Sequence, residues 1–243
     1  MKALLSTLAG VVIAWLIAPF VFTHLPNDRQ QIGTVVRVMR THPRLAVVGN
    51  SVAMYGVQFG TNLATPGQSI AESVMIANEL PGARIILVLT PWQLATSSTL
   101  NEQGWNAWWM YGLRPSAETR ALVGMPAMSD AVERFRSRWV VRAAFESAFA
   151  QGRATDEVWR GSEAFAIDPH QRRLIESIVA RRNVIIVLAP LSPIVRAHYR
   201  AMRVPFHNVI DATDLLQPDE FLDATHPNAR GAKKLTRFLA ERL

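Results

Sequence analysis

Residues 45–51 read Leu-Ala-Val-Val-Gly-Asn-Ser, an apolar run that ends in a glycine, an asparagine and a serine. A short, uninterrupted apolar run is typical of a parallel strand that is buried on both faces. Reacting groups of open α/β sheets collect at the carboxyl ends of such strands. The stretch therefore predicts a strand over residues 45–49 that places Ser51 at the functional edge of a sheet.

Further strands and helices are predicted on both sides of this stretch. Apolar runs that favour strands lie at residues 61–64, 84–89, 183–189 and 208–211. Helical patterns lie at residues 51–56, 70–80, 170–182 and 227–243. Alternation of strand and helix is the pattern of a parallel sheet that is covered by helices. We therefore expect an α/β fold, a three-layer α/β/α sandwich with a parallel sheet of about five strands.

The amino-terminal stretch has the pattern of a membrane anchor. Residues 3–23 carry no charged side chain, and a helix of about 20 apolar residues crosses the hydrocarbon core of a bilayer. Lys2 precedes the stretch, which favours an orientation with the rest of the chain outside the cytoplasm. A cleaved signal peptide and a buried helix of a soluble domain are the alternatives.

The domain organisation follows from this interpretation. We expect residues 1–27 to form a transmembrane helix and the start of a tether. Residues 28–243 would form one catalytic domain, because a chain of 243 residues leaves little room for a second full domain. The expected location is the cytoplasmic (inner) membrane, with a single pass and a periplasmic or extracellular domain.

Residues 97–165 interrupt the alternation of strands and helices. Five of the seven tryptophans fall here, at Trp105, Trp108, Trp109, Trp139 and Trp159, together with regularly spaced arginines between residues 134 and 142. Long insertions between sheet elements are usually functional. The aromatic side chains would either stack on sugar rings or contact the membrane, or they would form the core of the insertion itself.

Composition excludes several classes of site. The chain has no cysteine, so it has no disulfide, no thiolate metal site and no cysteine nucleophile. No HExxH-type motif or phosphate-binding glycine loop is present, and we expect neither a metal nor a cofactor. The chain has a formal charge of +7, but it contains no motif for nucleic-acid binding. Membrane proximity, a polyanionic substrate or a generally arginine-rich surface would each account for it.

Two residues near the carboxyl terminus complete a candidate catalytic set. Asp223 and His226 stand three residues apart before Pro227, which suits the first position of a helix. Both side chains would then project from the first turn of that helix. A serine becomes nucleophilic when a base removes its proton and a third group orients the base. Ser51, His226 and Asp223 have the side chains for these three roles.

These motifs resemble those of the SGNH/GDSL hydrolase family. The stretches Gly49-Asn50-Ser51, 62–67 (Asn-Leu-Ala-Thr-Pro-Gly) and 223–226 (Asp-Ala-Thr-His) are similar to its first, second and last blocks. The resemblance covers most of residues 43–243. It is strongest to membrane-anchored or periplasmic members that handle acyl groups on cell-surface polymers, such as the alginate O-acetylation proteins.

The chain departs from the family pattern at two places. Asn50 stands where the first block usually has aspartate. Residues 90–93 (Thr-Pro-Trp-Gln) stand where the third block supplies an asparagine after a glycine. The third oxyanion donor of the family therefore has no matching residue in this chain.

The resemblance implies a serine acyltransferase or esterase that acts on acetyl esters of a polysaccharide, with a membrane-bound O-acyltransferase as partner. The backbone N–H groups of Ser51 and Gly67 would stabilise the oxyanion, unless Gly67 serves only its turn. Trp92 and Gln93 are further substrate-binding candidates, and Gln93 is more simply a solvated loop residue. A carbohydrate acetylesterase and a non-catalytic scaffold of an acetylation complex are the alternative functions.

Overall fold

The computed structural model describes residues 41–65, 68–95, 166–180, 183–199 and 204–243, together with residues 6, 7, 10 and 13. The insertion at residues 97–165 lies outside the described residues, and so does the predicted anchor at residues 3–23, apart from those four positions. Within the described parts of the chain, no helix is long and apolar enough to span a bilayer. The anchor, the insertion and the domain boundary stay predictions.

Five parallel strands form one sheet in the order β2-β1-β3-β4-β5. They are β1 (Leu45–Gly49), β2 (Thr61–Asn62), β3 (Arg84–Leu89), β4 (Val184–Leu188) and β5 (Val209–Asp211). The α/β class and the five-stranded parallel sheet predicted from the sequence are thus confirmed. The strand order reverses between β1 and β3, and such a reversal opens a crevice at the carboxyl ends of the two strands. Ser51 follows β1 at this point.

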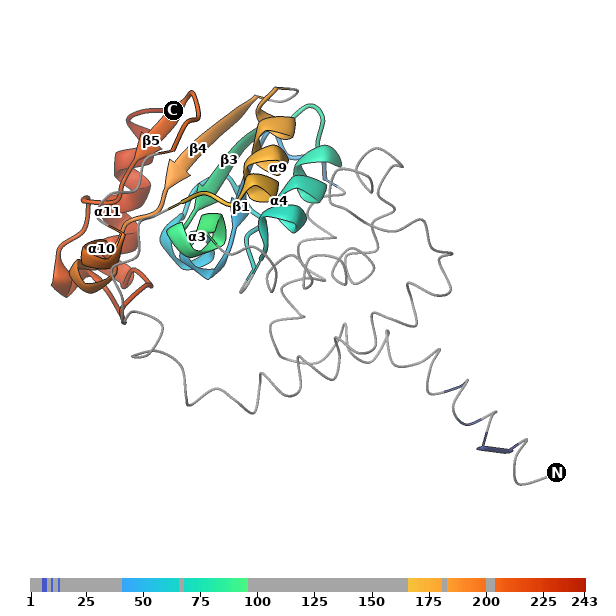
Figure 1. Cartoon of the computed structure of the whole chain (residues 1–243), viewed down its shortest axis with the longest axis horizontal. Helices are drawn as coiled ribbons and strands as arrows, with labels where there is room; N and C mark the ends of the chain where they lie inside the picture. The colour runs from blue at the N-terminus through green and yellow to red at the C-terminus, as the bar shows by residue number, and fades with distance from the viewer. Residues whose placement is uncertain are drawn as a thin grey trace.

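Helices cover both faces of the sheet. They are α3 (Ser51–Gly56), α4 (Ile70–Asn78), α5 (Pro91–Ala95), α9 (Pro169–Val179), α10 (Pro193–His198) and α11 (Ala229–Ala240), with a 3₁₀ turn η1 (Pro218–Glu220). Figure 1 shows α4 and α9 on one side of the sheet and α11 on the other.

Two buried clusters hold these layers together, because successive strand residues point to opposite faces. Leu87 of β3 belongs to the same cluster as Leu174 of α9, and both are fully buried. Ile86, the residue before it, belongs to the other cluster with Leu235 of α11. The sheet is therefore packed on both faces, which explains why its strands read as continuous apolar runs.

Helix α4 begins with a reciprocal cap that buries an acidic side chain. The Ser69 hydroxyl accepts the Glu72 N–H at 3.1 Å, and a Glu72 carboxylate oxygen accepts the Ser69 N–H at 2.6 Å. Glu72 is only 6% exposed. Burial raises the pKa of Glu72 to about 7, although the hydrogen bonds with Ser69 act in the opposite direction. Ionisation of Glu72 near neutral pH therefore opposes folding.

We expect Glu72→Gln to stabilise the protein at about pH 8 and to have little effect at about pH 4. The carboxyl of Glu72 titrates at 4.5 when exposed and at about 7 in the fold. The folded state binds more protons between these values, so the contribution of Glu72 to stability is largest below pH 4.5, and about 3 kcal/mol of it is lost as the pH rises to 7. Glutamine keeps the acceptor for the cap without a charge.

Urea titrations at both pH values measure this difference. Glu176→Gln, the same change at an exposed position of α9, is the matched control and should leave the pH dependence as it is in the wild type. If Glu72→Gln raised the free energy of unfolding by the same amount at both pH values, the interpretation would be contradicted.

Candidate active site

Asn50 shapes the turn that presents Ser51. Its side-chain oxygen accepts the Val52 N–H at 3.0 Å and caps α3, while its amide nitrogen donates to the Thr90 hydroxyl at 3.0 Å. Asn50 is 4% exposed, so both contacts are shielded from water. A capping residue that also reaches the end of β3 ties the carboxyl ends of two strands together. Ser51 is held at the first position of α3.

Gly49 has a conformation that other residues avoid. Its φ angle is +149°, and a Cβ atom there would lie 2.6 Å from the Val88 carbonyl oxygen. The Gly49 N–H donates to the side-chain oxygen of Gln68 at 2.8 Å. The backbone of β1 and that of β3 therefore approach each other so closely that only glycine fits.

Ser51, His226 and Asp223 come together across 175 positions of the chain. The Ser51 Oγ lies 2.8 Å from His226 Nε2. The other ring nitrogen, Nδ1, lies 2.7 Å from the Oδ2 atom of Asp223. A hydroxyl, an imidazole and a carboxylate in this order form the hydrogen-bonded chain that activates a serine.

The loop that carries His226 is folded on itself. The Asp223 Oδ1 atom accepts the backbone N–H of Thr225 at 2.7 Å and that of His226 at 2.8 Å. The Leu222 N–H donates to the His226 carbonyl oxygen at 2.7 Å. The two oxygens of Asp223 therefore have separate tasks, since one orders the loop and the other orients the imidazole.

The structure corrects the predicted start of the last helix. Pro227 does not occupy the first helical position, because it forms an antiparallel bridge with Phe221. Helix α11 begins at Ala229, where the Asn228 side chain accepts the N–H groups of the second and third helical residues at 3.0 and 3.1 Å. Asparagine is among the best caps. Asp223 and His226 thus project from a closed loop before the helix and not from its first turn.

The carboxylate of Asp223 is strongly favoured over its acid form. Burial would raise the pKa of Asp223, but hydrogen bonds from the His226 side chain and from the backbone N–H groups of Thr225 and His226 outweigh it and lower this pKa from 3.8 to about 2. The interaction stabilises the fold above pH 3.8 and is lost as the pH falls towards 2. Asp223 therefore stays charged at any pH near neutrality.

Two residues beside the imidazole were not predicted. Tyr55 lies one helical turn after Ser51, and its ring meets the His226 ring edge to face with centroids 5.6 Å apart at 89°. Tyr55 is 53% exposed, so part of its ring remains accessible to solvent beside His226. The Thr225 hydroxyl lies 3.2 Å from His226 Nδ1. The spacing of Tyr55 from Ser51 is visible in the sequence, but its contact with His226 is not.

Gln93 is buried, and the expectation of a solvated loop residue is wrong. It lies in α5 and is 2% exposed. Its side-chain oxygen accepts the N–H and the hydroxyl of Thr90 at 3.1 and 2.8 Å, and its amide nitrogen donates to the Gln68 carbonyl oxygen at 2.7 Å. A buried amide needs such partners. Gln93 therefore connects Thr90, at the end of β3, with Gln68 in the loop before α4.

The remaining substrate-binding candidates are placed differently. Trp92 is partly buried and packs against the cluster beneath α11. Gly67 lies outside the described residues. Gln68, which was not predicted, is 1% exposed and donates to the Leu63 carbonyl oxygen at 3.0 Å while it accepts the Gly49 N–H. It fixes the loop after β2 against the turn that carries Ser51.

The structure places one of the two predicted oxyanion donors, the backbone N–H of Ser51, at the start of α3. Ser51 is the first residue of α3, where a backbone N–H has no acceptor within the helix. The Asn50 side chain takes the N–H of Val52 and not that of Ser51. The Ser51 N–H therefore remains a candidate oxyanion donor at the amino end of α3. No group of three acidic or histidine side chains in the described ranges is arranged to hold a metal ion.

No family model matches this chain, and no curated protein matches it. A functional conclusion therefore depends on the residues and distances described above.

Proposed function

We propose that the chain is a serine acyltransferase or esterase that acts on acetyl esters of a cell-surface or exported polysaccharide. The observation that carries the proposal is the continuous hydrogen-bonded chain from the Ser51 Oγ through His226 to Asp223, with distances of 2.8 and 2.7 Å. The depressed pKa of Asp223 adds support, because a permanent carboxylate stabilises the imidazolium that forms during the reaction.

The proposed reaction proceeds through an acyl-enzyme. The Ser51 Oγ attacks the acyl carbonyl carbon while His226 Nε2 takes its proton. The Ser51 N–H stabilises the oxyanion, and the intermediate collapses as His226 returns the proton to the departing alcohol oxygen. Water or a sugar hydroxyl then attacks the acyl carbon, His226 takes the proton of the attacker, and Ser51 departs with that proton.

Transfer to a sugar is favoured over hydrolysis by two features. The expected anchor would keep the domain at a membrane, where a membrane-bound O-acyltransferase partner supplies acetyl groups. Tyr55 offers an exposed ring beside the base, and a sugar ring can pack its apolar face on it. A carbohydrate acetylesterase is the alternative activity, because water and a sugar hydroxyl attack the acyl-enzyme in the same way. A non-catalytic scaffold would not require the three side chains to meet.

The test is to expose the full chain in detergent to p-nitrophenyl acetate, with and without a neutral oligosaccharide. We expect an intact-mass increase of one acetyl group on Ser51 that decays faster when the oligosaccharide is present, together with acetylated oligosaccharide. Decay of the adduct at the same rate with and without the oligosaccharide, and without acetylated oligosaccharide, would indicate the esterase. Absence of both turnover and adduct would contradict the catalytic proposal and favour the scaffold.

Tyr55→Ala is expected to lower kcat by about tenfold, whereas Tyr55→Phe should keep most of it. An edge-to-face aromatic pair contributes about 0.5–1.5 kcal/mol, and 1.4 kcal/mol of lost alignment corresponds to about tenfold in rate. Phenylalanine keeps this pair without the hydroxyl. Steady-state rates with p-nitrophenyl acetate measure the effect. Equal rates for the alanine and phenylalanine variants would show that the ring does not position His226.

A further inference from the structure

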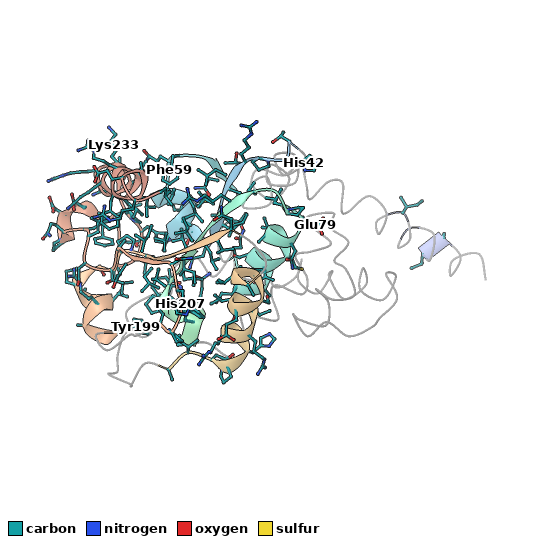
Figure 2. The ribbon with its side chains drawn as sticks, turned by 90° about the horizontal axis from the view of Figure 1, so that it is seen from above. His42, Phe59, Glu79, Tyr199, His207 and Lys233 are labelled. Atoms are coloured by element: carbon teal, nitrogen blue, oxygen red, sulfur yellow. The ribbon has the colours of Figure 1, made fainter. Side chains whose placement is uncertain are left out.

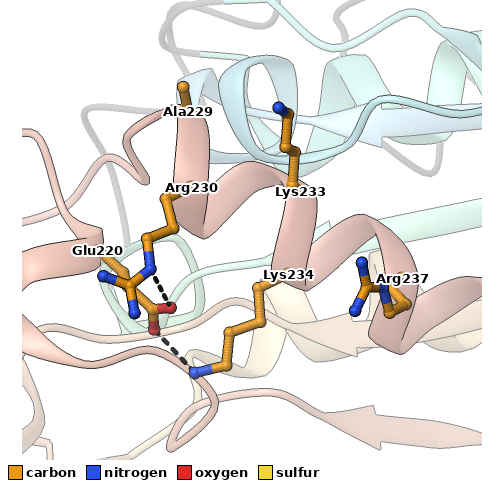
Figure 3. A pocket seen from close by; sticks show the side chains of 6 residues that line it. All are labelled: Glu220, Ala229, Arg230, Lys233, Lys234 and Arg237. Carbon is orange, nitrogen blue, oxygen red and sulfur yellow. Dashed lines mark hydrogen bonds and ion pairs between the residues drawn. The ribbon is translucent and has the colours of Figure 1, made fainter.

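Four cationic residues of α11 share one face of the helix. Arg230, Lys233, Lys234 and Arg237 are spaced by three and four residues, so their side chains lie in one stripe about 10 Å long. Together with Glu220 and Ala229 they line an open hollow of about 580 Å³ (Figure 3). We call these four residues the α11 basic face.

Glu220 holds two of the cations in place. Its carboxylate is 3% exposed and lies 2.8 Å from Lys234 Nζ and 3.6 Å from Arg230 Nε (Figure 3). The hydrogen bond from Lys234, supported by that from the Gln217 N–H, lowers the pKa of Glu220, so this side chain is charged. Arg230 also contacts Asp219 at 2.9 Å. These two cations are therefore preorganised and largely neutralised.

The other two cations are not neutralised. Lys233 and Arg237 are both exposed, and neither forms an ion pair with a carboxylate in the described ranges. They stand one turn apart, and like charges at this spacing destabilise a helix. Figure 2 shows Lys233 directed away from the body of the protein. An anion outside the chain would relieve this repulsion.

The carboxyl end of the chain, just after α11, lies near the place where the described domain begins. Arg84 connects the two places, since its N–H donates to the Arg44 carbonyl oxygen at 2.9 Å and its guanidinium donates to that of Leu243 at 2.6 Å. His42 and Lys233 lie towards the same side in Figure 2. Residues 24–40 span at most about 60 Å. A bilayer crossed by residues 3–23 is therefore within reach of α11.

The α11 basic face would bind a partner through its charges and not by inserting apolar side chains into a bilayer. The apolar residues Leu235 and Leu239 of α11 are fully buried against the sheet. The exposed large apolar side chains of residues 41–243, as far as the structure describes them, are Tyr55, Ile194 and Leu222, and none is on α11. A helix that keeps its apolar side in the protein core can only lie on headgroups.

We propose that the α11 basic face docks on the phosphate headgroups of an anionic lipid bilayer. Charge complementarity and the short tether favour this partner, because basic residues held near a membrane bind anionic lipids. Docking places His226, four residues before Arg230, close to the headgroup layer. The interaction does not use the Ser51 hydroxyl, so Ser51→Ala should dock like the wild type.

The absence of cysteine permits a single-label experiment on the full chain. Ala240→Cys labels the exposed end of α11, and Ala180→Cys labels the exposed end of α9 as a matched position on the other face of the sheet. Energy transfer to a headgroup dye is measured in phosphatidylcholine bilayers with and without phosphatidylglycerol. We expect phosphatidylglycerol to increase transfer from the α11 label more than from the α9 label, and salt to reverse the increase.

Charge variants test the residues. The double variant with Lys233→Gln and Arg237→Gln should have an affinity for bilayers that contain phosphatidylglycerol that is about 10- to 30-fold lower than that of the wild type. Arg172→Gln combined with Arg173→Gln removes the same charge from exposed positions of α9 and should have no effect. Circular dichroism checks that both pairs are folded.

Three outcomes would overturn the proposal. The first is equal transfer with the neutral and anionic bilayers, and the second is an unchanged response of the α11 pair. The third is that a soluble acidic oligosaccharide abolishes the lipid-dependent transfer, and that anionic bilayers cannot displace it at the concentrations used. That result would identify the α11 basic face as a glycan-binding face. The readout does not require insertion of residues 3–23, since the transfer reports approach of α11 to headgroups in either case.

Discussion

Replacing Ser51 with alanine is expected to lower acetyl-ester turnover by about 10⁴- to 10⁶-fold. In the proposed mechanism the Ser51 Oγ atom forms the acyl bond, and alanine has no atom that can take its place. Among the described residues the Ser51 hydroxyl has one hydrogen bond, to His226, so the fold should tolerate its loss. Intact-mass spectrometry should also show that the acetyl adduct disappears.

Ser177→Ala is the matched control for this experiment. The Ser177 hydroxyl donates to the Leu174 carbonyl oxygen within α9, on the face of the sheet opposite to α11. Its removal deletes the same atoms from the protein and should leave turnover within about twofold, as for other changes away from a site. If Ser51→Ala kept a tenth of the wild-type rate with an unchanged adduct, the nucleophile would have to be a different residue.

Asp223→Asn is expected to reduce turnover by about 10³- to 10⁴-fold while the loop stays folded. The amide oxygen of asparagine can still accept the N–H groups of Thr225 and His226, which bind Oδ1 in the wild type. Its NH₂ group then faces His226 Nδ1 in place of Oδ2. The imidazole must accept this hydrogen bond and carry its own proton on Nε2, where it cannot take the proton of Ser51.

The control for this variant is Asp214→Asn. Asp214 is an exposed carboxylate that pairs with Arg196, and surface pairs of this kind contribute little. We expect near wild-type kinetics and melting temperature there, whereas Asp223→Asn should remain folded but melt at a lower temperature, because it loses the stabilising interaction of the carboxylate. A loss of less than about tenfold in Asp223→Asn would show that the carboxylate does not determine the tautomer of His226.

The sheet was predictable because its strands are buried on both faces. The runs at β1 and β3 contain only apolar residues apart from their ends, so their bounds follow from hydrophobicity alone. The pairing of Ser51 with His226 was predicted from residue types and the motif resemblance. The distance between them depends on how α11 packs against α3, which no local pattern encodes.

The errors also have physical causes. Pro227 was interpreted as a first helical residue, but the side chain of the next residue, Asn228, provides a better cap and leaves the proline in a bridge. Gln93 was expected in solvent, because its partner Gln68 lies 25 residues away and is itself buried. Polar residues that satisfy each other inside a protein cannot be distinguished from surface residues by composition.

The loop between Phe221 and Pro227 is closed at its ends and bonded within, so Asp223 and His226 move as one rigid unit. Ser51, the proposed nucleophile, belongs to a separate unit, the turn after β1. The proposed catalytic set is therefore built from two separate structural units. A redesign can replace either the turn after β1 or the loop between Phe221 and Pro227 without changing the other. The distance that it must keep is the one between the Ser51 Oγ and His226 Nε2.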